Sequence, residues 1–423
     1  MHAHYPQQLG LIFWLMWLLL SPAMGAEPVL LSLDTAVTEA VTNNPSLAEM
    51  QARAEALADI PSQVGTLPDP ILQLNVLNLP VDTFNTGQEP MTQLQIGISQ
   101  ALPFPGKLGL RQDAARFEAE AASSNVDEVR LRLIRDVKST WWRLFYSDRA
   151  LETVAKNQGL LRQLVTIAST KYQVGKGLQQ DVLLAQLELS KLLDVQLQLE
   201  NMRRTQEARL NTLLDEPRDR ALRLPQYFNP ARPQVPSDAE LYDIAESNRP
   251  LLSAQQSRID ASRARLDLAR KDLYPDFTLG ALYGQRDSVT DFASVRLSVV
   301  VPLYAGSKQY KAIDQRNRER LGQQYGLLDQ RGRVQAEIAA ARADYVRARE
   351  QVILFDTGIL PQARQTVDSM RAGYQTNEVD FLNLVRAQVT LYNYEDRYWK
   401  AISDANGALA RLTAAVGREV HHE

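Results

Sequence analysis

Two long stretches of the chain place apolar residues at helical spacing. They cover about residues 107–173 and 305–375. Apolar positions recur every three or four residues, for example at Val137, Trp141 and Leu144, as they do along one face of an α-helix. A helix over the first stretch would be roughly 100 Å long at about 1.5 Å per residue. That length is typical of a coiled coil or a tube, and it argues against a compact globule.

Each long helix is followed by a break and a second helical pattern. Gly175-Lys176-Gly177 interrupts the first pattern, which resumes over about 178–214. The second copy breaks near residues 375–378 and resumes over about 379–416. Glycine favours turns because it has no Cβ. We therefore expect two helical hairpins, each with its tip at one of these breaks.

The two halves of the chain repeat each other. Three motifs recur 202 residues apart: Tyr172-Gln173 with Tyr374-Gln375, Ala185-Gln186 with Ala387-Gln388, and the stretches beginning at Ala208 and Ala410. A fixed period of half the chain indicates one fold unit built twice. At this offset Pro361 stands opposite Gly159. Since proline kinks a helix and glycine weakens one, both long helices are expected to bend at this level.

Four shorter segments alternate apolar and polar residues, as strands with one buried face do. They cover about 70–79, 92–101, 277–285 and 292–301. Strands of this length with one apolar face match those of a transmembrane barrel. Four strands cannot close a barrel, and lipid does not tolerate open edges. A ring of identical chains would complete it, whereas the alternative is a soluble protein with two surface hairpins.

The beginning of the chain has the pattern of a signal peptide over residues 1–26. The apolar run from Leu9 to Leu20 is shorter than the roughly 20 residues of a membrane span. Small residues follow it and offer cleavage after Gly25 or Ala26. An uncleaved anchor is the alternative, because no Lys or Arg precedes the run. No later run is apolar enough for a transmembrane helix. With the signal peptide set aside, the two repeats are predicted at 27–235 and 236–423.

Composition removes several classes of function. The net charge is −3, so no basic surface favours nucleic acid. The chain has no cysteine, which excludes disulfides, thiolate metal sites, thiol catalysis and a thioether-linked lipid. The phosphate-binding motifs GxxxxGK[ST] and GxGxxG are also absent. Gly106-Lys107 stands at a strand-to-helix corner and lacks the rest of a phosphate-binding loop. No catalytic constellation stands out, so we expect no enzyme activity, no cofactor and no metal site.

Three stretches resemble the TolC-type outer membrane efflux family, over essentially all of the mature chain. Residues 159–186, with the motifs YQVG and DVLLAQ, look like the periplasmic tip, and 374–388 look like its second copy. Residues 100–107 (QALPFPGK) look like the corner between a strand and the long helix. Together with 67–70 and 88–91, this corner is most similar to members that serve heavy-metal exporters of the resistance-nodulation-division class.

The resemblance implies a mainly α-helical fold with a small β part. Three chains would form a twelve-stranded outer membrane barrel, four strands from each, continued by a long periplasmic helical barrel. An equatorial belt would come from about 215–247 and the C-terminal tail. The homotrimer would contact outer membrane lipid, dock on a periplasmic adaptor and an inner membrane pump of the resistance-nodulation-division type, and act as a passive exit duct.

The resemblance also implies a gate at the tip, closed by polar links and a ring of acids in the lumen. Asp181 and Tyr374 match gate positions, whereas Asn383 and Arg386 stand where the family has acids. Helical spacing puts the last two on one stripe with Val379 and Thr390. Solvated coiled-coil positions are the alternative. The turns that carry the gate are predicted at Gly175, Gly177, Asn377, Glu378 and Asp380.

Two further groups have structural explanations. Trp141-Trp142 with Phe145 and Tyr146 could form a ligand platform, but packing between helices is the simpler interpretation. The terminal His421-His422-Glu423 could bind a metal ion, but an exposed tail is simpler, because two adjacent histidines cannot close a site. For the whole chain, the alternative to a duct is a non-channel coiled-coil structural or adaptor protein of the cell envelope.

Overall fold

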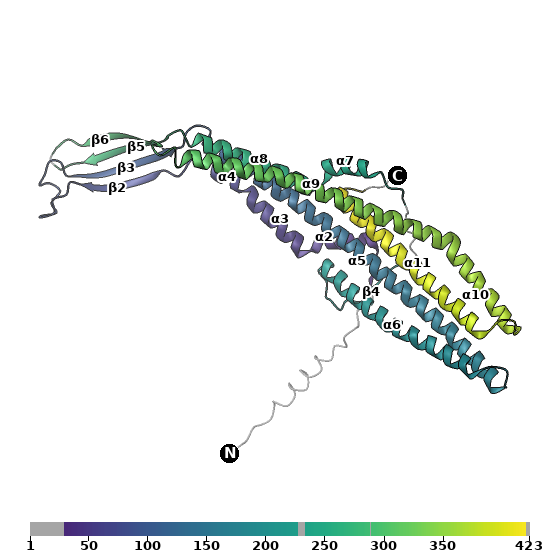
Figure 1. Cartoon of the computed structure of the whole chain (residues 1–423). Coiled ribbons are helices and arrows are strands. Elements are labelled where there is room, and N and C mark those ends of the chain that lie inside the picture. Colours follow the sequence, from purple (N-terminus) through teal and green to yellow (C-terminus); the bar gives the residue numbers. More distant parts are fainter. Residues whose placement is uncertain (1–28, 227–232, 288, 420–423) are drawn as a thin grey trace, which may run out of the picture.

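The computed structural model describes residues 29–226, 233–287 and 289–419 of the chain. These residues form an elongated molecule with a β-sheet at one end and two helical hairpins at the other (Figure 1). Long helices run between the two ends. The predicted signal peptide and the terminal histidines lie outside the described residues.

The described elements alternate between helices and short groups of strands. The strands are β1 (Val29–Leu30), β2 (Ile71–Leu77), β3 (Gln93–Leu102), β4 (Leu222–Arg223), β5 (Asp276–Gln285) and β6 (Phe292–Val300). The helices of the first half are α2 (Leu33–Asn43), α3 (Pro45–Ala58), α4 (Ile60–Gly65), α5 (Lys107–Gln173) and α6 (Gln179–Leu214). Those of the second half are α7 (Asp238–Asn248), α8 (Pro250–Lys271), α9 (Gln309–Leu354), the π-helical turn η1 (Phe355–Ile359), α10 (Leu360–Gln375) and α11 (Phe381–Val416).

Local sequence signals set several of the helix ends. Asn44 caps α3 by accepting from the amides of the second and third helical residues, and Pro45 occupies the first position, where no amide is needed. Ser237 and Glu240 form a reciprocal capping box at the start of α7. Gly417 ends α11 with φ of 90°, and a Cβ there would lie 2.5 Å from the Asn248 carbonyl oxygen. Glycine is therefore required at this close approach.

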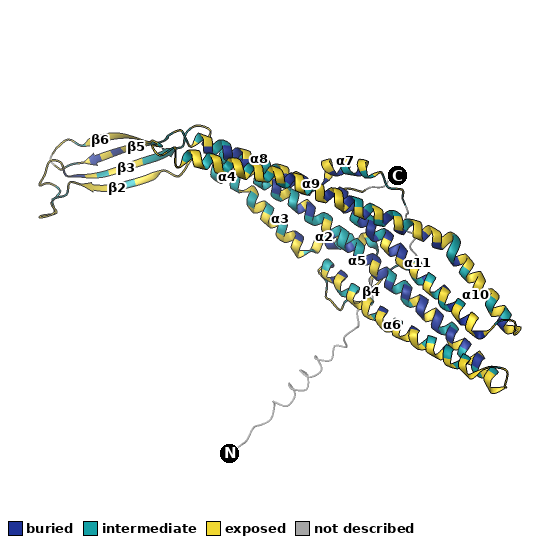
Figure 2. Ribbon diagram, viewed as in Figure 1, coloured by how far each residue is buried: buried dark blue, intermediate teal, exposed yellow. Residues whose placement is uncertain are grey.

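The main core lies at mid-length, where α2 and α3 pack on α5, and α11 also contributes buried side chains (Figure 2). Trp141 is fully buried, its ring stacks on Phe145 at 5.7 Å, and its indole N–H donates to the Leu31 carbonyl at 3.1 Å. Trp142 packs edge-on against both rings. The tryptophan pair thus packs helices together and does not form an open platform. A second cluster of buried apolar residues fills the hairpin end.

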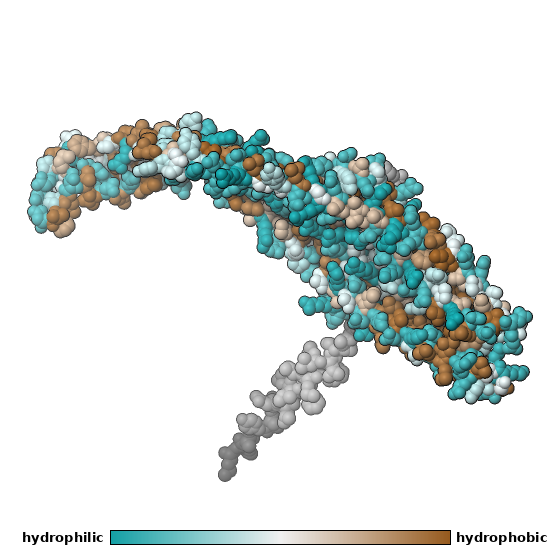
Figure 3. Space-filling view, viewed as in Figure 1, coloured by the Kyte–Doolittle hydropathy of each residue, from teal (hydrophilic) through white to brown (hydrophobic). Residues whose placement is uncertain are grey.

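The sheet is antiparallel with the order β2-β3-β5-β6, so β2 and β6 are its open edges. Its register aligns one apolar face, made of Leu72, Leu74, Val76, Leu94, Ile96, Ile98, Ala281, Tyr283, Ala293, Val295 and Leu297. The opposite face carries Gln73, Asn75, Gln93, Gln95, Ser99, Ser294, Arg296 and Ser298. Leu74 is 73% exposed and Val295 80% exposed. Hydrophobic side chains therefore gather on the surface of this end (Figure 3).

The second long helix changes direction between α9 and α10 (Figure 1). The π-helical turn η1 ends just before Pro361. Proline lacks an amide hydrogen and its ring crowds the carbonyl four residues earlier, so the turn before it cannot keep α-helical hydrogen bonds. At the matching level α5 continues as one α-helix through Gly159, without a π-helical turn. Among the described helices, none is both long and apolar enough to cross a membrane.

A few boundaries differ from those expected from the sequence. Strand β2 ends at Leu77 instead of residue 79, because Asn78 adopts φ of 55° and begins a turn. The Asn78 side-chain Nδ2 donates to the Met91 backbone carbonyl at 3.2 Å. Helix α9 begins at Gln309 instead of residue 305, after a run of hydrogen-bonded turns. Turn chemistry is hard to read from periodicity alone, which is why these ends shifted.

Candidate functional site

The two helical tips have the same backbone geometry. In the first, the Lys176 amide donates to the Lys171 carbonyl at 2.8 Å, and in the second the Glu378 amide donates to the Gly373 carbonyl at 2.8 Å. Gly175 and Asn377, which the sequence repeat pairs, have φ of 71° and 64°. Both tips are therefore Schellman-type helix ends closed by a residue in the left-handed region.

Close packing explains the remaining glycines of the tips. A Cβ at Gly177 would lie 2.9 Å from the Lys171 Cβ, and one at Gly373 would lie 2.6 Å from a Val379 methyl group. Of the predicted turn residues, Asp380 caps α11 without a side-chain hydrogen bond. Glu378 is exposed beside it. The predicted turn residues thus lie at the two tips, where they set backbone shape.

Lys171 joins the two tips within one chain. Its ammonium donates to the Asn377 side-chain oxygen at 2.8 Å and to the Tyr374 carbonyl at 3.2 Å. The same ammonium lies 4.0 Å from the centre of the Tyr374 ring, within cation–π range. Sequence analysis missed this residue. The available signal was that the repeat places a lysine in one copy where the other has Gly373.

Asp181 and Tyr374 come near each other, but no hydrogen bond joins them within the described chain. Tyr374 is buried and packs on the Phe381 ring at 5.4 Å between centroids. Burial raises the pKa of the Tyr374 phenol, and the negative charge of Asp181 raises it further. The two side chains therefore interact through charge within one chain. A direct link between them stays a prediction for neighbouring chains.

Asn383 and Arg386 lie away from these contacts, on the open face of α11. Both are exposed, as is Thr390, and Val379 is half-buried. The Thr390 hydroxyl donates to the Arg386 backbone carbonyl at 2.8 Å. In the described ranges, Arg386 has no ion-pair partner. The stripe of polar residues predicted on this helix is thus solvent-facing in the single chain.

A groove of about 970 Å³ runs above the tip between α5, α10 and α11. Apolar and charged side chains line it together. Lys156 and Arg364 each lie 3.5 Å from the buried Glu395 carboxylate. Deeper between the helices, the Gln388 side-chain Nε2 donates to the Asn157 side-chain oxygen at 2.7 Å. Buried polar pairs of this kind fix the register of packed helices. This layer holds α11 in register on α5 directly above the candidate gate.

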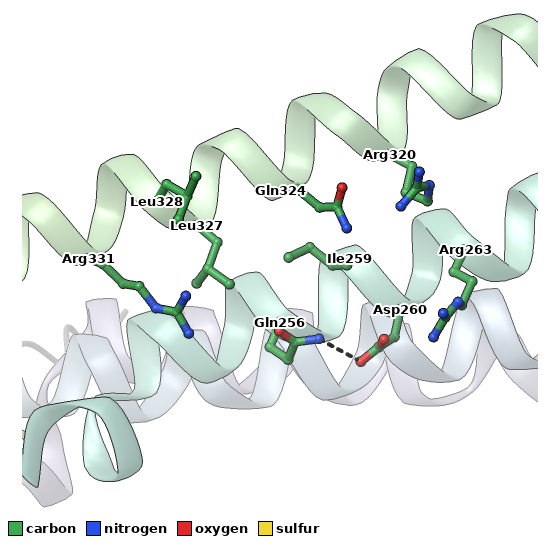
Figure 4. Close-up of a pocket in the computed structure, with 9 residues that line it drawn as sticks. All are labelled: Gln256, Ile259, Asp260, Arg263, Arg320, Gln324, Leu327, Leu328 and Arg331. Carbon is green, nitrogen blue, oxygen red and sulfur yellow. Dashed lines mark hydrogen bonds between the residues drawn. The ribbon is translucent and has the colours of Figure 1, made fainter. Parts of the chain in front are cut away.

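A second groove, of about 350 Å³, lies between α8 and α9 nearer the sheet (Figure 4). Arg263, Arg320 and Arg331 surround a floor that includes Ile259 and Leu327 (Figure 4). None of the predicted site residues lines it. Nowhere in the described ranges do three His, Asp or Glu side chains gather as a metal ion would require. The tip is therefore the site that the sequence motifs and the geometry share.

A polar contact higher up also ties α11 to α5. The Tyr146 hydroxyl donates to the Asp396 carboxylate at 2.9 Å. Burial raises the pKa of Asp396 above its usual range, and the Tyr146 hydrogen bond lowers it in part. Burial and the neighbouring carboxylate raise the pKa of the Tyr146 phenol. The Tyr146 hydroxyl thus stabilises the partly buried Asp396 carboxylate with one hydrogen bond.

Replacing this donor is expected to destabilise the protein in a pH-dependent way. In Tyr146→Phe the Asp396 pKa rises further, because the lowering hydrogen bond is gone. A carboxyl whose pKa is higher in the folded than in the unfolded protein stabilises the folded state at pH values below its unfolded-state pKa. This contribution is lost as the pH rises through the folded-state pKa. The variant should therefore lose about 1.5–3 kcal/mol near neutral pH, and less near about pH 4.

Thermal unfolding followed by circular dichroism at both pH values would measure the difference. Adding Asp396→Asn to Tyr146→Phe removes the charge, so this control should lose the pH dependence. An equal loss of stability at both pH values would show that the carboxylate is not the source.

Comparison with known proteins identifies the family to which this architecture belongs. A family model described as outer membrane efflux protein matches residues 36–216 and 241–418. The cobalt-zinc-cadmium resistance protein CzcC of Cupriavidus metallidurans is 22% identical over 412 residues, which cover 94% of this chain and 92% of that protein.

Solved structures have the same fold. The outer membrane protein VceC of Vibrio cholerae superposes with a TM-score of 0.77 at 18% identity, covering 91% of this chain and 96% of that one. The MtrE outer membrane channel of Neisseria gonorrhoeae gives 0.76 at 17% identity, covering 92% and 89%.

A strand-bearing end joined to long helical hairpins is thus the fold of outer membrane channels. This chain belongs to the outer membrane efflux protein family. It is located in the outer membrane and extends into the periplasm. The family consists of channel proteins and is not an enzyme family.

Proposed function

We propose that this chain is the outer membrane duct of a tripartite efflux system, assembled as a homotrimer. The main support is the four-stranded sheet. Its apolar face suits lipid, but β2 and β6 leave unpaired backbone groups at both edges. Lipid offers these groups no hydrogen bonds, so the edges must pair. Three sheets joined edge to edge would close a twelve-stranded barrel, and β6 would meet β2 of the next copy as an antiparallel pair.

The helices would continue this barrel into the periplasm as a tube. At its tip the duct would meet a periplasmic adaptor and an inner membrane pump of the resistance-nodulation-division type, which deliver the cargo. The relative CzcC is named for resistance to cobalt, zinc and cadmium. That name supports metal ions as a candidate cargo. Nothing in the described chain favours the alternative of a non-channel coiled-coil or adaptor protein.

In this proposal the tips form the gate. Lys171 holds the two tips of one chain together. Asp181 and Tyr374 would then act between neighbouring chains, where a hydrogen bond to a charged group contributes about 1.5–3 kcal/mol. Threefold symmetry would repeat the link around the ring. Asn383 and Arg386, on the open face of α11, would face the lumen.

The test is single-channel conductance of the detergent-extracted protein in planar bilayers. The wild-type protein should extract as a trimer and conduct weakly, because its tips are closed. The double variant Asp181→Ala with Tyr374→Phe should conduct more, because the link between chains is gone. Arg386→Asp should shift ion preference toward cations at low salt, where the field of the side chain is least screened.

Lys176→Gln is the matched control, because this exposed tip side chain is not a predicted gate residue and makes no hydrogen bond or ion pair among the described residues. Its conductance should stay at the wild-type level. A monodisperse monomer that is stable without detergent would overturn the duct itself. Unchanged conductance in the double variant would overturn only the assignment of the gate.

A further inference from the structure

The polar face of the sheet carries one charge in its central rows. Arg296 lies in the middle of β6, opposite Gly280 on β5, which in turn lies opposite Ser99 on β3. The side chain is exposed. Within the described residues it makes no hydrogen bond, ion pair or ring contact. Arg296 is thus an unpaired cation on the face that would line the barrel.

The arginine at the end of the β5–β6 hairpin, Arg286, is fully engaged. Arg286 donates to the carbonyls of Thr290 and Pro90, and its guanidinium stacks 3.7 Å from the centre of the Phe292 ring. These contacts hold it at the loop end of the hairpin. Among the described residues, Arg296 makes no such contacts.

No carboxylate of the four strands can neutralise Arg296. The strands contain one acid, Asp276, at the first position of β5. It accepts from the Phe104 amide at 2.7 Å and pairs with the buried Lys107 ammonium at 2.9 Å. In a closed ring, β6 would meet β2 of the next copy, whose polar face carries Gln73 and Asn75. Assembly therefore brings no strand carboxylate to Arg296.

We propose that Arg296 forms a ring of three cations that makes the barrel lumen favour anions over cations. The inference rests on the proposed trimeric duct. A narrow pore with low-dielectric walls focuses the field of fixed charges. Groups such as carboxylates, phosphates and anionic metal complexes would be drawn through this level. Bare divalent cations would meet a barrier there, so a metal-ion cargo would pass this level more readily as an anionic complex.

Because the chain has no cysteine, a single introduced thiol can report the charge near Arg296 separately from the gate at the tips. Ser294→Cys places the only thiol of the chain on the same face, two residues from Arg296. The trimer in a bilayer is treated from the outer side with an anionic or a cationic methanethiosulfonate, and both modification rates are measured. With Arg296 present the anionic reagent should be favoured. Adding Arg296→Gln should lower the anionic-to-cationic rate ratio on the order of tenfold at low salt.

Arg296→Lys is the control, because it keeps the charge and should keep the ratio. High salt should reduce the preference, since screening shortens the reach of the charges. A ratio that does not change between Arg296 and Arg296→Gln would overturn the cation ring while leaving the duct intact. No conductance in any variant, together with an unreactive thiol, would instead overturn the proposed duct.

Discussion

A lysine at Leu74 is expected to keep the protein out of the outer membrane, whereas a lysine at the adjacent Asn75 is expected to be tolerated. The register puts Leu74 opposite Ile96 on the apolar face, and Asn75 opposite Gln95 on the polar face. A lysine on the lipid face near the bilayer midplane costs about 2–4 kcal/mol. Every copy in the ring would bear this cost, so insertion should fail cooperatively.

The amount of each variant in purified outer membranes, and its oligomeric state in detergent, measures the effect. Ile96→Lys should behave like Leu74→Lys, because the two side chains lie side by side. Asn75→Lys is the matched control, since it adds the same charge to the same strand. Normal membrane levels of both apolar-face variants would mean that another face meets the lipid.

A second large effect is expected at the buried ion pair between Arg249 and Glu128. Each side chain is 4% exposed, and their charged atoms are 2.9 Å apart. Arg249 also donates to the Ala414 carbonyl, so it ties the start of α8 to both α5 and α11. Arg249→Met leaves the buried Glu128 carboxylate with only the more exposed Arg132, 2.8 Å away, among the ion-pair partners of the described residues. Removing one member of a buried pair costs up to about 3–5 kcal/mol.

Arg249→Met should therefore lower the thermal unfolding midpoint sharply, as followed by circular dichroism in detergent. The double variant Arg249→Met with Glu128→Leu should recover much of the loss, because it removes both charges. Asp127→Asn on the same helix breaks an exposed pair with Arg130, which contributes about 0–1 kcal/mol. If Arg249→Met were no more destabilising than Asp127→Asn, the buried pair would not hold the helices together.

Periodicity alone located the long elements well. Helix α5 runs from Lys107 to Gln173, and α11 ends at Val416, where the apolar pattern of each stops. Long helices are readable because many residues contribute to one period, and because Gly106 and Gly417 mark ends with backbone angles that other residues avoid. The strands were readable for the same reason, since alternation exposes one apolar face.

Contacts between distant segments were not readable in this way. Lys171 reaches Asn377 across more than 200 positions of the chain, and no local pattern predicts that meeting. Arg296 looked like one polar residue in an alternating strand until the register placed it among neutral partners. No local pattern singles out Arg249, which precedes Pro250. Each acquires its role from neighbours that the fold supplies.

The sequence by itself determined the long helices and the one-sided strands, and it predicted their doubled plan, because hydrophobic period and turn residues act locally. It also carried the motifs that place the chain in its family. Only the tertiary structure decided which charges stay free and which are paired. That outcome depends on burial and on distances between residues far apart in sequence, which set the strength of every electrostatic contact.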